Sequence, residues 1–199
     1  MIAIVDYGVG NLRSVERALQ HVGATAKLTS DKDELARANG MVLPGVGAFA
    51  AALRNLERGN LGRWIVELAR KGRPLFGVCL GYQLLFEESE EHGRHEGLGL
   101  LQGRVVEVTG APRLPVIGWC RLRQTEFSPL WTGIADGTYC YFLHSFTPSA
   151  SRDALAATEH SPAAAAGRLN VMGTQFHPEK SGADGLRVYA NFLDFCGAG

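Results

Sequence analysis

A cysteine between two glycines is the first feature of this sequence that could carry chemistry. Residues 77–81 read Gly-Val-Cys-Leu-Gly and fall between a predicted strand and a predicted helix. This is the pattern of a nucleophile elbow, in which a tight turn lifts the reactive side chain above a sheet. A helix that starts at Cys79 would also favour the thiolate through its dipole. We therefore predict that Cys79 is a nucleophile.

The alternative for Cys79 is an ordinary buried thiol, since free cysteine is usually a core residue. The flanking glycines and the strand–helix boundary argue against this alternative at position 79. Cys120, Cys140 and Cys196 lack that context, so we interpret them as packing residues.

A thiol nucleophile needs a base, and the base needs a group that orients it. His177-Pro178-Glu179 offers both, directly after a predicted strand over residues 171–176. The carboxyl ends of parallel strands are where the active sites of open α/β sheets lie. His-Pro-Glu alone is a weak motif, and a surface or helix-capping histidine is the alternative. Together with the elbow, it predicts a Cys-His-Glu triad.

The elements that position these residues follow from the hydrophobic pattern. Short apolar runs predict buried strands, and spacings of three and four predict amphipathic helices. Strands are predicted at 1–6, 24–29, 40–43 and 74–78, and helices at 12–22, 61–72, 80–86 and 183–196. Short β-like runs over 98–125 and 137–175 suit antiparallel additions. We expect one α/β domain over residues 1–199, with a doubly wound, mostly parallel sheet and antiparallel additions.

Composition narrows the functional classes. The 199 residues are 46% hydrophobic, and 20 Lys plus Arg balance 20 Asp plus Glu. A neutral chain lacks the basic excess that nucleic-acid binding needs. The start of the sequence has no signal-peptide pattern, and no apolar run reaches membrane-spanning length. The four cysteines form no CxxC pair. We expect a cytoplasmic protein with free thiols, without metal, cofactor, nucleic acid or membrane.

Several segments resemble a known family. GVCLGYQ at 77–83 and QFHPEKS at 175–181 resemble the class I glutamine amidotransferases. PGVGAF at 44–49 is similar to the glutaminase subunits of imidazole glycerol phosphate synthase, since most relatives have Pro-Gly-Gly there. The same subfamily is indicated by segments at 6–15, 86–91, 118–120 and 141–146.

The resemblance implies roles for the triad and for an oxyanion hole. Cys79 attacks the carboxamide of L-glutamine and forms a thioester, while His177 transfers protons and Glu179 orients His177. Backbone N–H groups of Leu80 and of the Val46-Gly47 loop meet the oxyanion. Because glycines flank Val46, we hypothesise that a peptide of this loop flips and that the hole is completed when the partner binds.

The resemblance also implies a glutamine-binding set: Gln83, Glu91, His144, Ser145 and Phe146. Glu91 could pair with the substrate α-ammonium group, and backbone groups at 144–146 could receive its α-carboxylate. The alternative for Glu91 is a solvated acidic face, because residues 87–91 are rich in acids.

The implied partner is a HisF-type (β/α)₈-barrel cyclase in a heterodimer, which would consume the ammonia. The matching interface positions are Asn11, Trp119, Tyr141 and Lys180. For Trp119 the alternative is core packing. Cys120 stands where the family usually has Asn, and a thiol cannot supply an amide's donor and acceptor. Phe146 stands where Tyr is common.

Three other functions stay open at this point. The first is a glutaminase that serves another synthase, such as pyridoxal phosphate synthase, which the Pro-Gly-Val-Gly loop disfavours. The second is a catalytically silent binding subunit, which the intact triad disfavours. The third is a cysteine protease or a chaperone on a related sheet, which Gln83 and the His-Pro-Glu context disfavour.

Overall fold

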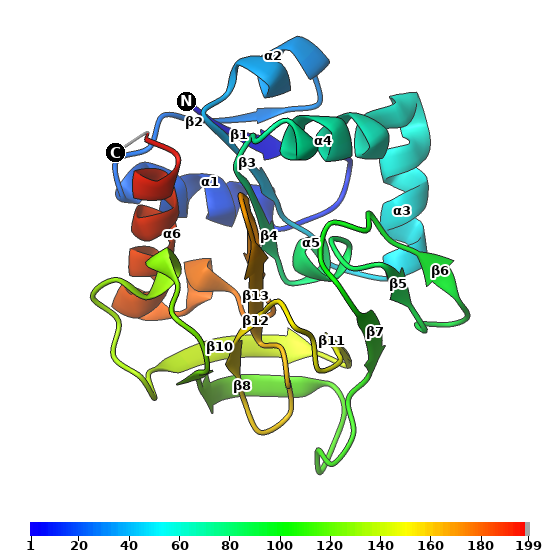
Figure 1. Cartoon of the computed structure of the whole chain (residues 1–199), viewed down its shortest axis with the longest axis vertical. Helices are drawn as coiled ribbons and strands as arrows, with labels where there is room; N and C mark the ends of the chain where they lie inside the picture. Colours follow the sequence, from blue (N-terminus) through cyan, green and yellow to red (C-terminus); the bar gives the residue numbers. More distant parts are fainter. Residues whose placement is uncertain (198–199) are drawn as a thin grey trace.

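An eight-stranded sheet crosses the centre of the molecule in the computed structural model, which describes residues 1–197 (Figure 1). Its strands run in the order β2-β1-β3-β4-β14-β13-β12-β9. The first five in this order pair in parallel. Their bounds are β2 Ala26–Thr29, β1 Ile2–Val5, β3 Gly40–Leu43, β4 Leu75–Val78 and β14 Val171–Thr174. This confirms the predicted doubly wound parallel sheet.

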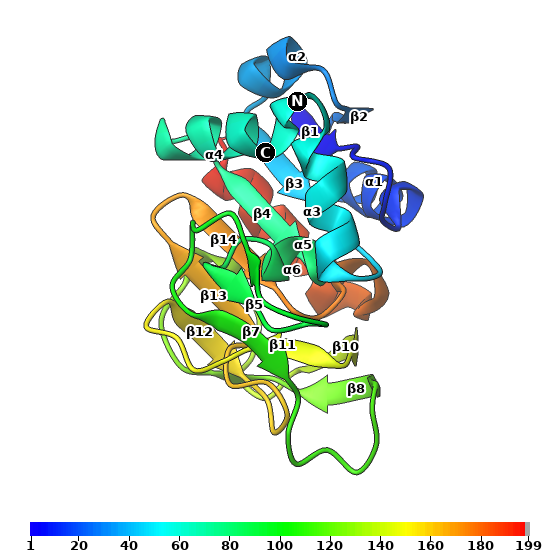
Figure 2. The same cartoon turned by 90° about the vertical axis from the view of Figure 1, so that its right-hand side faces the viewer.

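Helices cover both faces of this sheet, as Figures 1 and 2 show. Helices α1 (Leu12–His21) and α6 (Gly182–Phe195) pack on one face and share a hydrophobic cluster with the sheet. Helices α2 (Lys32–Arg37), α3 (Phe49–Glu57) and α4 (Leu61–Arg70) form a second cluster on the other face. Strands β1, β3 and β4 are buried along their whole length because both of their faces are covered.

Two of these helices, α2 and α3, were not predicted from the sequence. Helix α2 is only six residues long, although Asp31 caps it by accepting a hydrogen bond from the Glu34 N–H. Helix α3 follows the glycine-rich loop at 44–47 and buries Phe49, Ala52 and Leu56 at helical spacing. Alanines occupy several positions of α3, and the helix directly follows a glycine-rich loop. Its hydrophobic periodicity in the sequence is therefore weak.

The helix predicted over 80–86 is wrong in length. Helix α5 spans only Leu80–Gln83, after which the chain turns. The carbonyls of Leu84 and Phe86 accept hydrogen bonds from residues 98 and 99 instead of continuing a helical ladder. A helix of a single turn has a much weaker dipole than the longer helix predicted after Cys79. Other groups must therefore stabilise a thiolate at Cys79.

The antiparallel additions lie at the end of the molecule away from the two termini (Figure 2). Strands β13 (Ala165–Arg168), β12 (Ala154–Ala157) and β9 (Arg123–Gln124) extend the main sheet. A ribbon pairs β8 (Val116–Arg121) with β10 (Tyr139–His144). A small mixed sheet, in which β5 and β7 pair in parallel, joins β11 (Phe146–Pro148), β7 (Arg104–Glu107), β5 (Glu88–Ser89) and β6 (His95–Glu96).

Strand β14 corrects one part of the prediction, because it lies in the region assigned to antiparallel additions and yet pairs in parallel with β4. Three short 3₁₀ turns complete the described residues 1–197: η1 (Arg58–Asn60), η2 (Pro129–Trp131) and η3 (Pro178–Lys180). Within residues 1–197, none of the helices has the length and apolar character needed to cross a bilayer.

Candidate active site

Cys79 lies in a strained turn between β4 and α5. Its backbone has φ 54° and ψ −110°, a positive-φ conformation that is uncommon outside glycine. Its N–H donates to the Thr174 carbonyl at 2.8 Å, which ties the turn to the end of β14. A strained residue held by surrounding hydrogen bonds is characteristic of functional sites. The predicted elbow is therefore present in the fold.

The two glycines of the elbow are required by close packing. A Cβ atom on Gly81 would lie 1.8 Å from the Leu43 carbonyl oxygen, and one on Gly77 would lie 2.6 Å from the Tyr82 Cα. Both neighbours are backbone atoms that cannot move aside cheaply. The turn between β4 and α5 thus crosses β3 at a distance that only glycine allows.

His177 and Glu179 form a buried pair beside the elbow. His177 Nδ1 lies 2.8 Å from Glu179 Oε1, and the two side chains are 3% and 1% exposed. Because β14 pairs in parallel with β4, His177 and Cys79 both follow the carboxyl ends of adjacent strands. The His177 N–H donates to the Tyr141 carbonyl at 3.0 Å, which holds the backbone of the histidine. The surface-histidine alternative is excluded.

The electrostatics of this pair favour a charged imidazole. Burial lowers the pKa of His177, but hydrogen bonds to the Cys79 sulfur and to Glu179, with their negative charges, outweigh it and raise this pKa to about 9. The carboxylate of Glu179 can only accept, so Nδ1 carries the proton that it binds. The arrangement suits a thiolate–imidazolium pair that can exchange a proton during catalysis.

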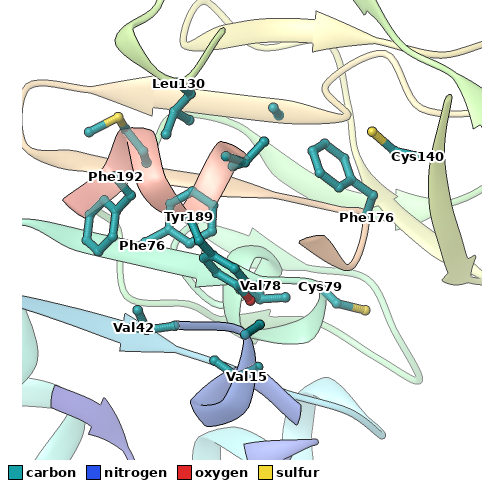
Figure 3. Close-up of a cluster of buried hydrophobic side chains, with 14 of the residues drawn as sticks. Val15, Val42, Phe76, Val78, Cys79, Leu130, Cys140, Phe176, Tyr189 and Phe192 are labelled. Carbon is teal, nitrogen blue, oxygen red and sulfur yellow. The ribbon is translucent and has the colours of Figure 1, made fainter. Parts of the chain in front are cut away.

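Two residues that the sequence analysis did not single out support the His–Glu pair. The Ser181 hydroxyl donates to the His177 carbonyl at 2.7 Å, and the Tyr189 hydroxyl lies 3.4 Å from Glu179 Oε2. Figure 3 shows Tyr189 among Phe76 and Phe192, with Cys79 at the edge of the same buried cluster. From the sequence, Tyr189 was placed only within the predicted helix over 183–196.

A small cavity joins most of the predicted site residues. Its volume is about 160 Å³, below the roughly 300–1,000 Å³ of pockets for drug-sized ligands, which suits a small metabolite. It is lined by Val46, Gly47, Cys79, Leu80, Gln83, Glu91, Leu143, His144, Phe146, His177 and Lys180. A larger hollow of about 760 Å³ lies between α3, α4 and residues 96–98, but it contains neither cysteine nor histidine. The reactive side chains therefore identify the smaller cavity as the site, although the other hollow has the larger volume.

The predicted glutamine-binding residues are only partly free to bind a ligand. Gln83 Nε2 donates to the Phe146 carbonyl at 2.7 Å, so its amide oxygen is the atom left for a substrate donor. Glu91 Oε2 accepts from the Phe49 N–H at 2.7 Å, which leaves Oε1. Ser145 lies outside the cavity lining, and its carbonyl accepts a hydrogen bond from Val108. The solvated-face alternative for Glu91 does not fit these contacts.

His144 is buried and neutral. Burial lowers its pKa from 6.5 to about 4, and this effect outweighs the hydrogen bond to the Phe146 carbonyl. Nδ1 lies 3.0 Å from that carbonyl, which can only accept, so Nδ1 is the protonated nitrogen. Nε2 is then a buried acceptor, and it has no partner within the described chain.

The predicted oxyanion donors lie around the same cavity. The Leu80 and Gly47 N–H groups donate to no backbone or side-chain acceptor in residues 1–197. Gly47 has φ 99°, a conformation that side chains rarely adopt, and Val46 beside it is 45% exposed. Two unpaired donors beside a sulfur nucleophile are the elements of an oxyanion hole.

Gln175 and Leu143 are the functional candidates that sequence reasoning missed. Gln175 is fully buried, and its Nε2 lies 3.8 Å from Cys79 Sγ. The Leu143 carbonyl lies 3.8 Å from the same sulfur. A polar residue two positions before His177, inside a buried strand end, is the signal that could have identified Gln175.

Three of the four predicted interface positions lie together, with Trp119 and Tyr141 on the β8–β10 ribbon and Lys180 in η3. On the β8–β10 ribbon, Trp119 is 55% exposed and packs edge-on against Tyr141 at 6.1 Å, which excludes the core-packing alternative. Lys180 Nζ lies 5.6 Å from the centre of the Tyr141 ring. Asn11 lies apart from the ribbon, at the start of α1, and α1 contacts η3.

The remaining cysteines are poor nucleophiles. Burial raises the pKa of Cys120, and it raises the pKa values of Cys140 and Cys196 to about 12. These thiols stay protonated near neutral pH, as expected for packing residues. The described residues include no group of three His, Cys, Asp or Glu side chains that could hold a metal ion.

Solved structures with the same fold are glutamine amidotransferases and related assemblies. One described as glutamine amidotransferase superposes with a TM-score of 0.78 at 20% identity, covering 99% of this chain and all of that chain. PurLQS from Thermotoga maritima gives a TM-score of 0.76 at 21% identity, with 98% and 97% covered. These similarities show that this chain shares the fold of those structures.

Sequence relatives are more specific. This chain is 44% identical to imidazole glycerol phosphate synthase subunit HisH of Bacillus cereus (strain G9842), covering 96% of this chain and 93% of the relative. It is 46% identical to the subunit of the same name from Geobacillus thermodenitrificans, with 97% and 95% covered. The family model for class-I glutamine amidotransferases matches residues 3–195. The chain therefore belongs to the class-I glutamine amidotransferase family.

Proposed function

We propose that this protein is the glutaminase subunit of an imidazole glycerol phosphate synthase and hydrolyses L-glutamine to glutamate and ammonia. The observation that carries the proposal is the buried His177–Glu179 pair beside Cys79 at the carboxyl ends of β14 and β4. The relatives' shared name, imidazole glycerol phosphate synthase subunit HisH, supports the choice of synthase.

The chemistry begins with attack by the Cys79 thiolate on the side-chain carbonyl carbon of glutamine. The tetrahedral intermediate collapses when His177 gives its proton to the departing nitrogen, which leaves as ammonia. A water molecule then attacks the thioester while His177 takes its proton, and the Cys79 thiolate leaves. The Glu179 carboxylate accepts a hydrogen bond from Nδ1–H throughout, so that Nε2 is the nitrogen that exchanges protons.

Negative charge that develops on the substrate oxygen is stabilised by backbone donors. The free N–H groups of Leu80 and of the Val46-Gly47 loop are the proposed pair. Each donor of this kind contributes roughly 10²–10³-fold in rate. The exposed, glycine-flanked Val46 is the part of the hole that a docked partner could adjust.

Substrate specificity follows from the atoms left free in the cavity. Glu91 Oε1 and Gln83 Oε1 are acceptors suited to an α-ammonium group, and backbone groups at 144–146 are proposed to hold the α-carboxylate. The neutral His144 adds no charge that would oppose the ammonium group. The small volume selects an amino acid over a peptide.

Ammonia is useful to a synthase only if it reaches the acceptor without being lost to water. We propose that a HisF-type (β/α)₈-barrel cyclase docks on the outer face of the β8–β10 ribbon, as the second subunit of a heterodimer. This face exposes Ile117, Trp119, Tyr139 and Leu143, while Leu143 also lines the cavity. Exposed aromatic side chains of this kind are typical interface anchors.

The test is release of glutamate from glutamine by the purified chain, alone and with a barrel cyclase and its nucleotide ligand. The proposal predicts strong stimulation by the cyclase. Glutaminase activity that ignores the cyclase would reassign the chain to another synthase. No activity under any condition would leave only a binding subunit.

A further inference from the structure

A chain of side-chain amides connects the wall of the cavity to the sulfur of Cys79. Gln83 Nε2 lies 2.7 Å from the Phe146 carbonyl oxygen and 3.0 Å from Gln175 Oε1. At the other end of the chain, Gln175 Nε2 lies 3.8 Å from Cys79 Sγ, within the range for a sulfur acceptor. Gln175 is fully buried, so no water competes for its amide.

The direction of this chain is fixed by the Phe146 carbonyl. A carbonyl can only accept, so Gln83 must present its NH₂ group to Phe146. The same NH₂ group meets Gln175, which must therefore present its oxygen to Gln83. The remaining end of the Gln175 amide is a donor, and it faces the sulfur. The orientation of an amide is thus decided by the network around it.

We propose that Gln175 is a further catalytic residue, whose amide donates a hydrogen bond to the Cys79 sulfur and stabilises the thiolate. This inference rests on Cys79 being the nucleophile proposed above. Besides His177, the sulfur has two further partners, and they suit different protonation states of Cys79. A thiol can donate its proton to the Leu143 carbonyl, whereas a thiolate can accept from Gln175.

The donor acts wherever negative charge rests on the sulfur. The thiolate carries that charge before it bonds to the carbonyl carbon, and again when the C–S bond of the thioester breaks. A hydrogen bond to the charged form favours that form, and burial strengthens the effect. Gln175 takes over the stabilising role that a one-turn α5 is too short to supply through its dipole.

The experiment measures the thiol directly and needs neither glutamine nor a partner. The full chain is treated with iodoacetamide between pH 5 and 10, and alkylation of Cys79 is followed by mass spectrometry of its peptide. Only the thiolate reacts, so the rate rises with pH to a plateau. Gln175→Met is expected to move the inflection up by about one pH unit, with alkylation a few-fold slower below it.

The height of the plateau separates a direct role from a structural one. A variant that only distorts the cavity changes access to the sulfur, and hence the plateau, without moving the inflection. Gln175→Met should move the inflection and raise the plateau by no more than about threefold, because a more basic thiolate is a stronger nucleophile. Gln83→Met removes the residue that orients Gln175 but leaves the donor, so a smaller shift is expected. The double variant should match Gln175→Met, because an orienting residue has nothing left to orient.

An unmoved inflection in Gln175→Met would overturn the proposal. If that variant does not fold, Gln175→Leu has a similar size, lacks the donor and adds no charge beside the sulfur. An unmoved inflection in Gln175→Leu would overturn it equally. Glutaminase activity is scored separately, so a shifted inflection in a chain that does not hydrolyse glutamine would reject only the proposed function.

Discussion

The carboxyl edge of the parallel sheet and the β8–β10 ribbon lie side by side, but they are built in opposite ways. At the sheet edge, the side chains of His177 and Glu179 are at most 3% exposed and bonded to each other. On the ribbon, burial alternates along each strand, and Trp119 and Tyr139 stand more than half exposed. The buried pair at the sheet edge satisfies its charged groups internally, whereas the ribbon leaves apolar surface uncovered.

The difference indicates that the His177–Glu179 pair is complete in the isolated chain, whereas the ribbon is not covered. A closed network of buried charges sets protonation states without help from outside. An exposed apolar face gains from being covered, as protein–protein interfaces do. Lys180 connects the two regions, because it directly follows Glu179 in the sequence and its Nζ lies over the ring of Tyr141 in the ribbon. Changes at the sheet edge should therefore alter chemistry, and changes on the ribbon should alter association.

The largest effect is expected from Cys79→Ala. Removing the nucleophile should lower glutamate release by at least about 10⁴-fold, since the rest of a triad cannot replace it. Thermal unfolding should change little, because the sulfur lies at the edge of a cavity. Cys140→Ala is the matched control, and it should lose stability but keep activity. Glutaminase activity in the Cys79→Ala variant would contradict the assignment of the nucleophile.

The next largest effect is expected from Glu179→Gln. Glu179→Gln removes the negative charge beside His177 and replaces an acceptor-only group by an amide that can also present its NH₂ group to Nδ1, so kcat should fall by about 10²–10⁴-fold. The acid form of His177 should also lose its proton at lower pH, because Glu179 helps to raise that pKa. Tyr189→Phe removes only the 3.4 Å contact to Glu179 and should cost less than about tenfold. Equal losses in the two variants would contradict this ranking.

Trp119→Ala tests the ribbon. We expect the unfolding free energy of the isolated chain to change by less than about 0.5 kcal/mol, because the side chain is exposed. Binding to the cyclase should weaken by about 2 kcal/mol or more, as for an aromatic anchor. Isothermal titration calorimetry measures this loss. Leu169→Asn is the control, since Leu169 is 86% exposed in the β13–β14 turn, far from the ribbon, and has φ 56°, which Asn tolerates.

The smallest effect concerns the neutral histidine of the cavity. Folding lowers the pKa of His144 from 6.5 to about 4, so the unfolded chain binds a proton there first as pH falls. Stability from this group is present above pH 6.5 and is lost as pH falls toward 4. Between pH 7 and 5, wild type should lose about 2 kcal/mol more unfolding free energy than His144→Asn. Urea denaturation at pH 7 and at pH 5 measures these losses. Equal losses of unfolding free energy in the two proteins would reject a neutral His144.

Much of the sheet edge could be predicted from the sequence because its signals are local. The elbow glycines, the apolar strands and the step from His177 to Glu179 each specify a backbone path. The parallel pairing of β14 with β4 could not be read in this way, since strand order is a property of the whole sheet. The early end of α5 could not be predicted either, because it depends on hydrogen bonds that the carbonyls of residues 84–86 accept from residues 98–101.

The contacts of the site were harder to predict than its members. Gln83, Glu91, His144 and Phe146 line the cavity as expected, but Ser145 does not. Gln175 was missed because its role depends on Gln83, which is 92 positions away in the sequence. Long-range hydrogen bonds leave no periodic pattern, so sequence reasoning finds the reactive groups before it finds the groups that tune them.

The most direct test of the central claim is covalent labelling with the glutamine analogue 6-diazo-5-oxo-L-norleucine, read out by peptide mass spectrometry. We predict one adduct per chain, on Cys79, and protection by glutamine. Cys120, Cys140 and Cys196 should stay unlabelled, because burial keeps their thiols protonated. An adduct on one of those three cysteines, or no adduct at all, would contradict the account.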